Sequence, residues 1–304
     1  MQPRPTATIA IPTRARPAYL EVTLASVVPQ AALADAEVLV VSDGAHAATT
    51  EVAHRHGVRL LSLPTRAGLN AARNAAVTAA GSDLIVFTDD DVVAPPDWLA
   101  AVLSGARGAP DRDVFGGPIR ARLEGGGPRA CGREPVPIST LELGAEDRDA
   151  PHVWGANMAI RARAFRLVGG FDEAISGRGD EEEWQRRYAA RGGRIRYLAA
   201  AGLDHRRDVA DSRLRVLARS AYGHGRAARR NDVRKGAAPA IAGELRTLAG
   251  CAWHVVRRRC ANGVVLTVHA AGRLWESLGA WKAPGARRER SLGSRVTRRA
   301  QRRR

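Results

Sequence analysis

The N-terminal third of the chain alternates short apolar runs with longer segments of helical periodicity. Four runs are rich in β-branched and aliphatic residues and end on turn-forming residues, as buried strands do. These runs span residues 8–13, 38–44, 58–63 and 84–88. The segments that begin at Pro17 and Gly68 carry apolar or alanine residues at helical spacing. Strands that alternate with helices predict an α/β fold, with a mostly parallel sheet flanked by helices.

The middle of the chain is less regular. Residues 98–103 predict a helix with one apolar face, and residues 114–118 and 194–198 predict further strands. Between them, residues 123–149 are rich in Gly, Pro and mixed charge. A loop of this length is either a lid or binding loop, or a plain insertion.

Beyond residue 207, apolar residues recur at helical spacing and are surrounded by arginine. The three stripes consist of Leu214, Leu217, Ala218 and Ala221; of Leu245, Leu248, Cys251, Ala252 and Val255; and of Val264, Val265, Val268, Leu274 and Leu278. We predict an α/β domain over residues 1–207 and a basic amphipathic helical extension over residues 208–304, with a disordered Arg-rich end at 298–304. The helices either pack on the first domain or contact a membrane surface.

Charge is distributed very unevenly along the chain. The formal net charge is +17, yet residues 1–205 carry 23 Lys and Arg against 25 Asp and Glu. Residues 206–304 carry 25 against 6. The excess positive charge therefore lies in the last third, which indicates a catalytic or binding domain followed by a region that meets an anionic surface.

The cysteines and the lack of long apolar segments indicate the compartment. Cys131, Cys251 and Cys260 show no C-x-x-C spacing, so the sequence predicts neither a disulfide framework nor a zinc site. The N-terminus has no secretory signal pattern, and no apolar stretch reaches the roughly 20 residues that cross a bilayer. We expect a cytoplasmic protein, at the inner face of the membrane if the extension binds lipid.

Three consecutive carboxylates follow the apolar run at residues 84–88, namely Asp89, Asp90 and Asp91. If the chain stays extended there, Asp89 and Asp91 point to one side and Asp90 to the other. Two carboxylates on one side repel each other unless a cation lies between them, and Mg²⁺ or Mn²⁺ prefers such oxygen ligands. The alternative is a solvated acidic turn after a strand.

Polar groups also follow the other predicted strands. Pro12, Asp43 and Asp89 would all lie at the carboxyl edge of a parallel sheet, where such sheets bind ligands. Arg73 lies on one helical face together with Asn70. Beside a carboxylate-rich site, Arg73 could serve as a structural counter-ion or could hold a nucleotide base or phosphate.

A second acidic cluster comes later in the chain. Asp180 and Glu181 open a segment that carries Trp184 and Tyr188 on one helical side. Carboxylates in the first turn of a helix are stabilised by its dipole, so a purely structural cluster is one interpretation. A catalytic acidic pair is the other.

Several of these motifs together resemble glycosyltransferase family 2. The motifs are Ile11-Pro12-Thr13, Val41-Ser42-Asp43-Gly44, Gly68-Leu69-Asn70-Ala71-Ala72-Arg73-Asn74 and Phe87-Thr88-Asp89-Asp90-Asp91, in the order and at about the spacing of the family. The resemblance covers about two thirds of the chain. It implies a GT-A fold, which is Rossmann-like, a nucleotide-sugar donor, a divalent metal ion and inversion at the anomeric carbon.

The resemblance also assigns the donor site. It implies that Pro12, Thr13 and Asp43 cradle the nucleoside, with Asp43 accepting a hydrogen bond from the base. Arg73 would lie beside them in the donor site.

The Asp triplet completes this implied site. Asp89 and Asp90 would belong to the donor site, with Asp89 approaching the ribose or the metal ion. Asp91 would be the metal ligand proper, and His205 would complete the metal or diphosphate site.

Two further segments, residues 152–161 and 168–173, resemble the acceptor side of the family. Trp154, Gly155 and Asn157 lie in the first of them and would contact the acceptor. The family places its general base in an acidic pair that is usually Glu-Asp, whereas this chain has the reverse order. By alignment, the resemblance implies Glu181 as the base, with Asp180 as the second candidate.

The expected function is that of an inverting, metal-dependent glycosyltransferase, using Mg²⁺ or Mn²⁺. The donor would be a nucleotide sugar, with UDP the commonest nucleotide in the family, and the acceptor a hydroxyl of a glycan or a lipid-linked molecule. The alternatives are a nucleotidyltransferase on a similar sheet and a polyanion-binding protein that acts through residues 208–304. These residues contain no nucleic-acid-binding motif, so we expect no nucleic-acid partner. Peripheral contact of residues 208–304 with an anionic membrane stays one of the two alternatives for the helices.

Overall fold

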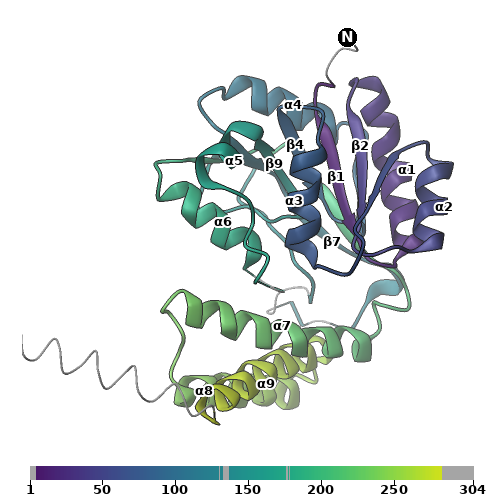
Figure 1. Ribbon diagram of the computed structural model, residues 1–304. Helices are drawn as coiled ribbons and strands as arrows, with labels where there is room; N and C mark the ends of the chain where they lie inside the picture. Colours follow the sequence, from purple (N-terminus) through teal and green to yellow (C-terminus); the bar gives the residue numbers. More distant parts are fainter. Residues whose placement is uncertain (1–4, 130, 133–136, 176, 178, 283–304) are drawn as a thin grey trace, which may run out of the picture. The chain divides into compact units, whose positions relative to one another are not determined.

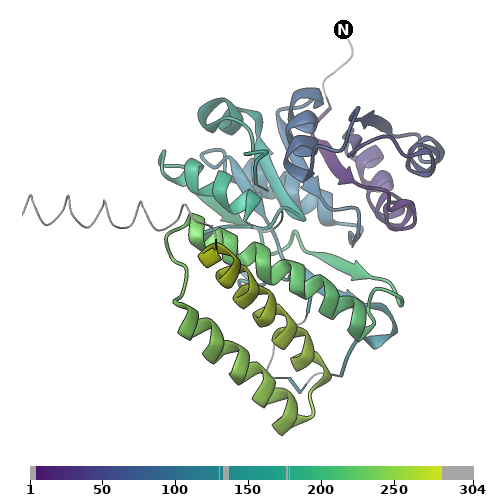
Figure 2. The ribbon, with the colours of Figure 1, turned by 60° about the horizontal axis from the view of Figure 1, so that its bottom comes forward.

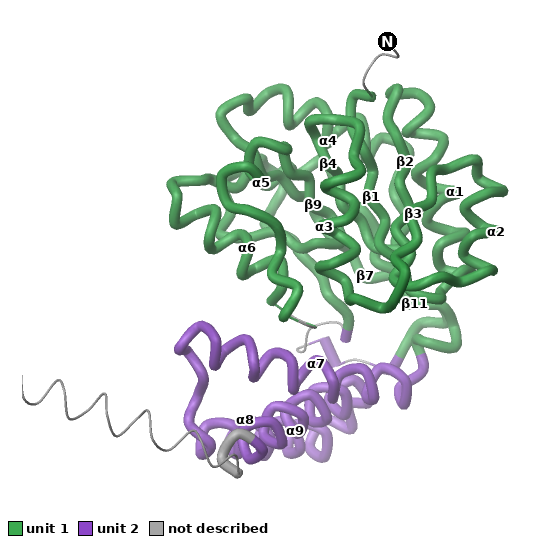
Figure 3. The backbone as a smooth tube through the Cα atoms, viewed as in Figure 1, with its two compact units in different colours: residues 1–127, 138–212 green, residues 128–137, 213–304 purple. Residues whose placement is uncertain are grey.

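The computed structural model describes residues 5–129, 131–132, 137–175, 177 and 179–282. The chain divides into two compact units, shown in Figure 3. Unit 1 consists of residues 1–127 and 138–212, and unit 2 of residues 128–137 and 213–304. The predicted Arg-rich end at residues 298–304 lies outside the described residues.

Unit 1 is built on a sheet in the order β3-β2-β1-β4-β9-β6-β10-β8. Its strands are β1 (Thr8–Thr13), β2 (Glu37–Ser42), β3 (Arg59–Ser62), β4 (Leu84–Thr88), β6 (Val114–Gly116), β8 (Arg148–Ala150), β9 (Asn157–Arg161) and β10 (Ile195–Tyr197). Strands β3, β2, β1 and β4 pair in parallel, whereas β9 runs antiparallel between β4 and β6. The predicted α/β class with a mostly parallel sheet is therefore confirmed.

Helices flank this sheet, and α3 lies over β1 and β2 (Figure 1). The helices of unit 1 are α1 (Pro17–Leu33), α2 (Ala47–Arg55), α3 (Leu69–Ala79), α4 (Trp98–Gly108), α5 (Ala162–Val168) and α6 (Asp180–Ala189). The side chain of Trp184 anchors α6, because it is fully buried and packs against Phe165 and Phe171. The same burial fixes the first turn of α6, where Asp180 and Glu181 lie.

A second, three-stranded sheet has the order β5-β11-β7, from β5 (Val92–Val93), β7 (Ile119–Leu123) and β11 (Leu203–Arg207). A short 3₁₀ turn, η1 (Glu124–Gly126), follows β7. Strand β11 pairs antiparallel with β5, so that His205 lies opposite Val92, and the amide of Arg206 donates to the carbonyl of Asp91 at 2.7 Å. This pairing brings the end of β11 next to the Asp triplet.

Unit 2 contains three helices, α7 (Leu214–Arg234), α8 (Ile241–Arg258) and α9 (Ala261–Lys282). Helix α9 lies between α7 and α8 (Figure 2). Two glycines allow the close contact of α7 with α9: a Cβ on Gly225 would lie 2.0 Å from the carbonyl oxygen of His269, and one on Gly272 would lie 2.2 Å from that of Tyr222. The predicted helical extension is confirmed, and no helix among the described residues is long and apolar enough to cross a membrane.

Part of the arginine in unit 2 forms internal ion pairs. Glu244 of α8 is buried and accepts hydrogen bonds from Arg273 of α9 at 2.8 and 3.0 Å. Arg229 of α7 donates to the same carboxylate at 3.1 Å, and Arg273 also reaches Asp232 at 2.8 Å. A buried carboxylate with two arginines therefore links the three helices, which accounts for some of the basic residues without an external partner.

Candidate active site

The carboxyl ends of β1 and β2 lie side by side, as the sequence predicts. Pro12 and Thr13 end β1 and pair with Val41 and Ser42 of β2, and Asp43 follows directly. The Asp43 carboxylate is held in place, since its Oδ1 accepts the amide protons of Ala67 at 2.7 Å and Gly68 at 3.1 Å.

The Asp triplet lies beside these strand ends but is not extended. Strand β4 ends at Thr88, so the alternation of side chains assumed for the triplet stops before Asp89. Arg16 donates both to Asp90 at 2.7 Å and to Asp91 at 2.9 Å, and the Thr13 hydroxyl donates to Asp90 at 2.6 Å. The extended conformation assumed for the triplet is therefore wrong, but Asp89 and Asp91 do share one cluster of ligand atoms, which does not include Asp90.

Asp89, Asp91 and His205 form one cluster, with ligand atoms within 4.8 Å of one another. Nδ1 of His205 lies 3.1 Å from the Ser139 carbonyl, to which it must donate, and Nε2 lies 3.2 Å from Oδ1 of Asp91. The structure thus brings together the three residues that the family resemblance implies as metal ligands.

Two arginines that were not predicted from the sequence also contact this cluster. Arg16 precedes α1, and Arg207 at the end of β11 forms an ion pair with Asp91. A signal for Arg207 was available: it lies two residues after His205, so on a strand both side chains point to the same side. The pairing of β11 with β5 was not predicted, and without it that signal could not be used.

Burial and the surrounding charges shift the pKa values of Asp89, Asp90 and Asp91 in different directions. Burial by itself would raise the pKa of Asp91, but the contact with His205 and the charges of His205, Arg207 and Arg16 hold it well below its ordinary range. For Asp90, burial and the charge of Asp91 outweigh Arg16 and raise the pKa to about 7. Burial and the charge of Asp91 also raise the pKa of Asp89.

The donor set of this cluster fits a divalent metal ion. Two carboxylates and an imidazole converge, and the Nδ1–H bond of His205 leaves Nε2 as the coordinating nitrogen. Oδ1 of Asp91 is buried and makes no well-formed hydrogen bond to the described residues. A cation would bind where these atoms face one another.

The second acidic cluster opens α6 and contains a buried ion pair. Nη1 of Arg73 lies 2.7 Å from Oδ2 of Asp180, and both side chains are almost fully buried. Arg73 thus lies at the acidic pair and acts as its counter-ion, which was one of the two roles considered from the sequence. Burial tends to raise the pKa of Asp180, but the charge of Arg73 and hydrogen bonds hold it below its ordinary value.

Glu181 differs from its neighbour in environment. Its side chain is half-buried, and Oε1 accepts a long hydrogen bond of 3.4 Å from the amide of Gly155. Burial and the negative charge of Asp180 raise the pKa of Glu181 well above its ordinary value. Two adjacent carboxyls therefore have pKa values shifted in opposite directions, as is typical of acid–base sites.

Arg73 connects the two carboxylate clusters. Burial lowers its pKa, but the charges of Asp180, Glu181 and Asp89 outweigh burial and raise it. The backbone also brings the two clusters near each other, because the Thr88 hydroxyl, next to Asp89, donates to the carbonyl of Ala156 at 2.9 Å, and the preceding Gly155 lies against Arg73 and donates to Glu181.

The three predicted acceptor residues have different surroundings. The ring nitrogen of Trp154 donates to the carbonyl of Thr140 at 3.1 Å, and the side chain is half-buried. Asn157 is buried, and its amide bonds to Trp98, Pro118 and Ala201. These bonds favour a structural role for Asn157, because acceptor binding through its amide would require breaking them.

Gly155 allows the guanidinium of Arg73 to lie against the backbone, since a Cβ there would lie 2.1 Å from Nη2. We expect Gly155→Ala to lower the free energy of unfolding by about 1–3 kcal/mol, because Arg73 could move only by weakening its pair with Asp180. Urea denaturation measures this. Gly108→Ala is the matched control, with no atom within 4 Å of its added Cβ, and should be neutral or slightly stabilising. Equal stability of the two variants would contradict the expectation.

The sequence of residues 8–169 matches the family described as Glycosyl transferase family 2. Pre-mycofactocin glycosyltransferase of Mycobacterium tuberculosis is 33% identical over 181 residues, which cover 56% of this chain and 36% of that protein. Validoxylamine A glucosyltransferase of Streptomyces hygroscopicus is 30% identical over 209 residues, 59% of this chain and 50% of that protein. The chain thus spans half or less of the length of these relatives.

Solved structures share the fold at low sequence identity. The crystal structure of GalNAc-T7 with UDP, GalNAc and Mn²⁺ has a TM-score of 0.54 and 16% identity, covering 75% of this chain and 48% of that chain. That of S. aureus TarS has a TM-score of 0.51 and 16% identity, covering 74% and 42%. The predicted GT-A fold is therefore confirmed.

Proposed function

Because the chain belongs to glycosyl transferase family 2, we propose that it transfers a sugar from a nucleotide-sugar donor to an acceptor hydroxyl, with inversion at the anomeric carbon. One observation carries the proposal. The Asp89–Asp91–His205 cluster and the Asp180–Glu181 pair both adjoin residues 155–156: the hydroxyl of Thr88, which precedes Asp89, donates to the carbonyl of Ala156 at 2.9 Å, and the amide of Gly155 donates to Glu181 at 3.4 Å. An inverting transfer needs charge stabilisation at the leaving diphosphate and a base at the acceptor, and the two clusters supply these at one site.

On the donor side, Asp89, Asp91 and His205 would hold Mg²⁺ or Mn²⁺. When bound, such an ion supplies positive charge to the diphosphate as the bond to the anomeric carbon breaks. Arg16 and Arg207 hold the Asp91 carboxylate and bring further positive charge to the same place.

The nucleoside would lie along the ends of β1 and β2. There the two amides at Asp43 Oδ1 orient the carboxylate, and its other oxygen would accept a hydrogen bond from the base. Pro12 and Thr13 would line the same edge, although the Thr13 hydroxyl already donates to Asp90.

On the acceptor side, Glu181 is the better candidate for the base. Asp180 is buried and held by Arg73, whereas Glu181 is half-buried and has a raised pKa. Its carboxylate would take the proton of the acceptor hydroxyl as that oxygen attacks the face of the sugar opposite the diphosphate. Trp154 and the backbone of Gly155 would position the acceptor.

Release of nucleoside diphosphate tests the proposal. Wild-type protein should release UDP from a UDP-sugar in the presence of Mn²⁺ and an acceptor, since the GT-A structure of GalNAc-T7 with UDP and Mn²⁺ makes these the first ligands to try. The acceptor in our proposal is a glycan or lipid-linked hydroxyl, and the Streptomyces relative suggests small molecules of the validoxylamine type as a second set. Turnover of a nucleoside triphosphate in place of a sugar nucleotide would favour a nucleotidyltransferase.

The pH dependence follows from the base assignment. Glu181 acts as a base only when deprotonated, so kcat/KM should rise with pH through its raised pKa, above the value of about 4.3 for an ordinary Glu. Burial is the larger cause of that shift and the charge of Asp180 the next. Asp180→Asn removes the second cause, so the acidic limb of the profile should move to lower pH. A limb that stays in place or moves upward would exclude Glu181 as the titrating base.

We also propose that unit 2 contacts the anionic inner face of a membrane, through α8. Leu245, Trp253 and Val256 are 51%, 63% and 72% exposed, and their spacing places them on one broad side of the helix. Arg257 and Arg258 are exposed at the end of the same helix. Apolar side chains next to arginines favour an interfacial helix on anionic lipid.

Vesicle co-sedimentation measures this contact. The protein should bind phosphatidylglycerol vesicles more strongly than phosphatidylcholine vesicles, and added salt should weaken the binding. Trp253→Asp should reduce the affinity by at least about tenfold, because burial of one large apolar side chain contributes about 1.5–3 kcal/mol. Leu33→Asp in unit 1 is the control, since Leu33 is 89% exposed outside the extension. Equal effects of the two substitutions, or a charge-independent affinity, would argue against the contact.

A further inference from the structure

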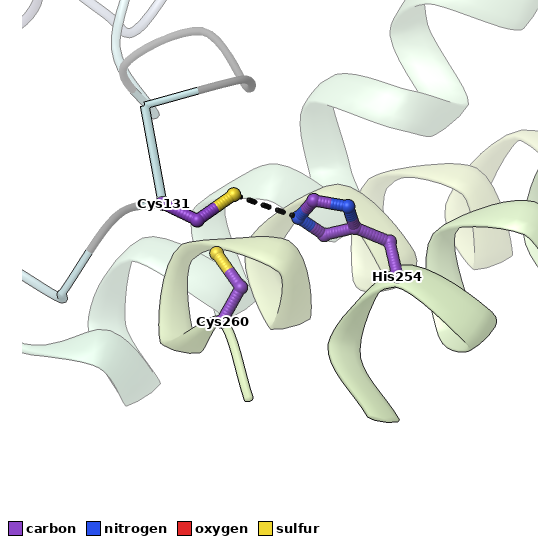
Figure 4. A group of neighbouring side chains, drawn as sticks. All are labelled: Cys131, His254 and Cys260. Atoms are coloured by element: carbon purple, nitrogen blue, oxygen red, sulfur yellow. Dashed lines mark hydrogen bonds between the residues drawn. The ribbon is translucent and has the colours of Figure 1, made fainter. Parts of the chain in front are cut away.

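Unit 2 contains a second cluster of metal-ligating side chains, formed by Cys131, His254 and Cys260 (Figure 4). Their sulfur and imidazole nitrogen atoms all lie within 4.8 Å of one another. Sγ of Cys131 is 3.4 Å from Nε2 of His254. The cluster joins three parts of unit 2: Cys131, His254 in the last part of α8, and Cys260, which directly precedes α9.

We propose that these three side chains bind Zn²⁺ or a similar borderline-soft divalent ion. Two thiolates and one imidazole form a ligand set that zinc prefers, whereas Mg²⁺ prefers oxygen. In a tetrahedral zinc site, bond lengths of about 2.3 Å to sulfur and about 2.0 Å to nitrogen place sulfur and nitrogen about 3.5 Å apart. The observed distance of 3.4 Å between Sγ of Cys131 and Nε2 of His254 is close to this value.

The backbone holds the ligands near this arrangement. The amide of Asn262 donates to the carbonyl of Arg129 at 3.2 Å, which fixes the segment two residues before Cys131 to the first turn of α9. The amide of Gly263 lies 3.3 Å from Sγ of Cys260. A Cβ on Gly263 would lie 3.0 Å from Cδ2 of His254, so the glycine lets that turn lie against the imidazole.

The burial of the ligands indicates the fourth position. Cys260 is buried, His254 is half-buried and Cys131 is exposed, so the coordination sphere opens to solvent on the Cys131 side. A water molecule would complete the tetrahedron there. The ion would link Cys131 to His254 and Cys260 and stabilise unit 2, because binding occurs only when the three ligands are assembled.

The lack of a C-x-x-C motif predicted no zinc site, but zinc ligands need not be cysteines that lie close together in the sequence. Here two ligands lie six residues apart, whereas Cys131 and His254 are separated by 123 positions. Only the folded unit brings them together.

Cobalt titration of the full-length, reduced and metal-free protein tests this site. Thiolate ligands give Co²⁺ a sulfur-to-metal charge-transfer band, which the Asp89–Asp91–His205 cluster cannot produce. We expect one equivalent of Co²⁺ to give this band, together with the visible bands of tetrahedral cobalt, and Zn²⁺ to displace it. Cys131→Ser, Cys260→Ser and His254→Gln should each lower the affinity by at least about 100-fold.

Cys251→Ser is the matched control, because Cys251 lies on α8 one turn before His254 and outside the cluster. It should retain wild-type cobalt binding. Cys131 is exposed, so its serine variant should fold, and its circular dichroism spectrum checks this.

Two results would overturn the proposal. One is a wild-type protein without the charge-transfer band, or with a band that Cys131→Ser leaves unchanged. The other is a Cys131–Cys260 disulfide, found by peptide mass spectrometry in protein purified without reductant, together with no cobalt uptake after reduction.

Discussion

Asp91→Asn is expected to lower kcat/KM for sugar transfer by at least about 10³-fold. In the proposed mechanism Asp91 is the central metal ligand, and a metal ion contributes several kcal/mol of charge stabilisation, at about 1.4 kcal/mol for each factor of ten. The substitution keeps the shape of the side chain but removes the charge that pairs with Arg16, Arg207 and His205. Nucleoside diphosphate release at saturating Mn²⁺ measures the loss.

Asp83→Asn is the control for this variant, because Asp83 is exposed just before the opposite end of β4. It should retain close to wild-type activity. Circular dichroism and a urea midpoint separate loss of the site from loss of the fold. A folded Asp91→Asn protein with nearly full activity would show that Asp91 does not hold a catalytic metal ion.

Glu181→Gln should lower the rate of transfer by about 10²–10⁴-fold while donor binding is retained, because general-base catalysis contributes a factor of this size. Glutamine keeps the contact that Oε1 makes with the Gly155 amide but cannot accept the acceptor proton. Turnover and nucleotide affinity, measured on the same preparation, separate the two roles.

Glu182→Gln makes the same change of charge at the next position of α6 and should stay close to wild type. Wild-type turnover in Glu181→Gln, with loss in Asp180→Asn, would move the base to Asp180. Loss of donor binding in Glu181→Gln would place Glu181 at the nucleotide and not at the acceptor.

The parallel part of the fold could be read from the sequence. Strands β1, β2 and β4 are continuous apolar runs because both of their faces are covered, and such runs are easily recognised. Strands β5 and β11 were not predicted, since β5 has two residues and β11 reads Leu-Asp-His-Arg-Arg. Their pairing is tertiary information that no local pattern carries.

The same limit applies to the site. Asp89, Asp91 and His205 were grouped by resemblance, and the structure brings them together. Arg73 and Asp180 lie 107 positions apart, so their ion pair could not be predicted from the sequence. Both roles considered for Arg73 therefore stayed open until the structure brought the two side chains together. Arg16 and Arg207, which both contact Asp91, lie near the beginning and the end of the unit 1 sequence. Their convergence on Asp91 therefore could not be inferred from sequence spacing.

Calorimetric titration of UDP, GDP and dTDP into the wild-type protein and Asp91→Asn, first with Mn²⁺ and then with EDTA, tests the donor site most directly. We expect one of the three diphosphates to bind wild type in Mn²⁺, and its binding to be lost both in EDTA and in Asp91→Asn. Binding that persists in EDTA and in Asp91→Asn, or no binding of any diphosphate to the folded protein, would contradict a metal-dependent nucleotide-sugar site.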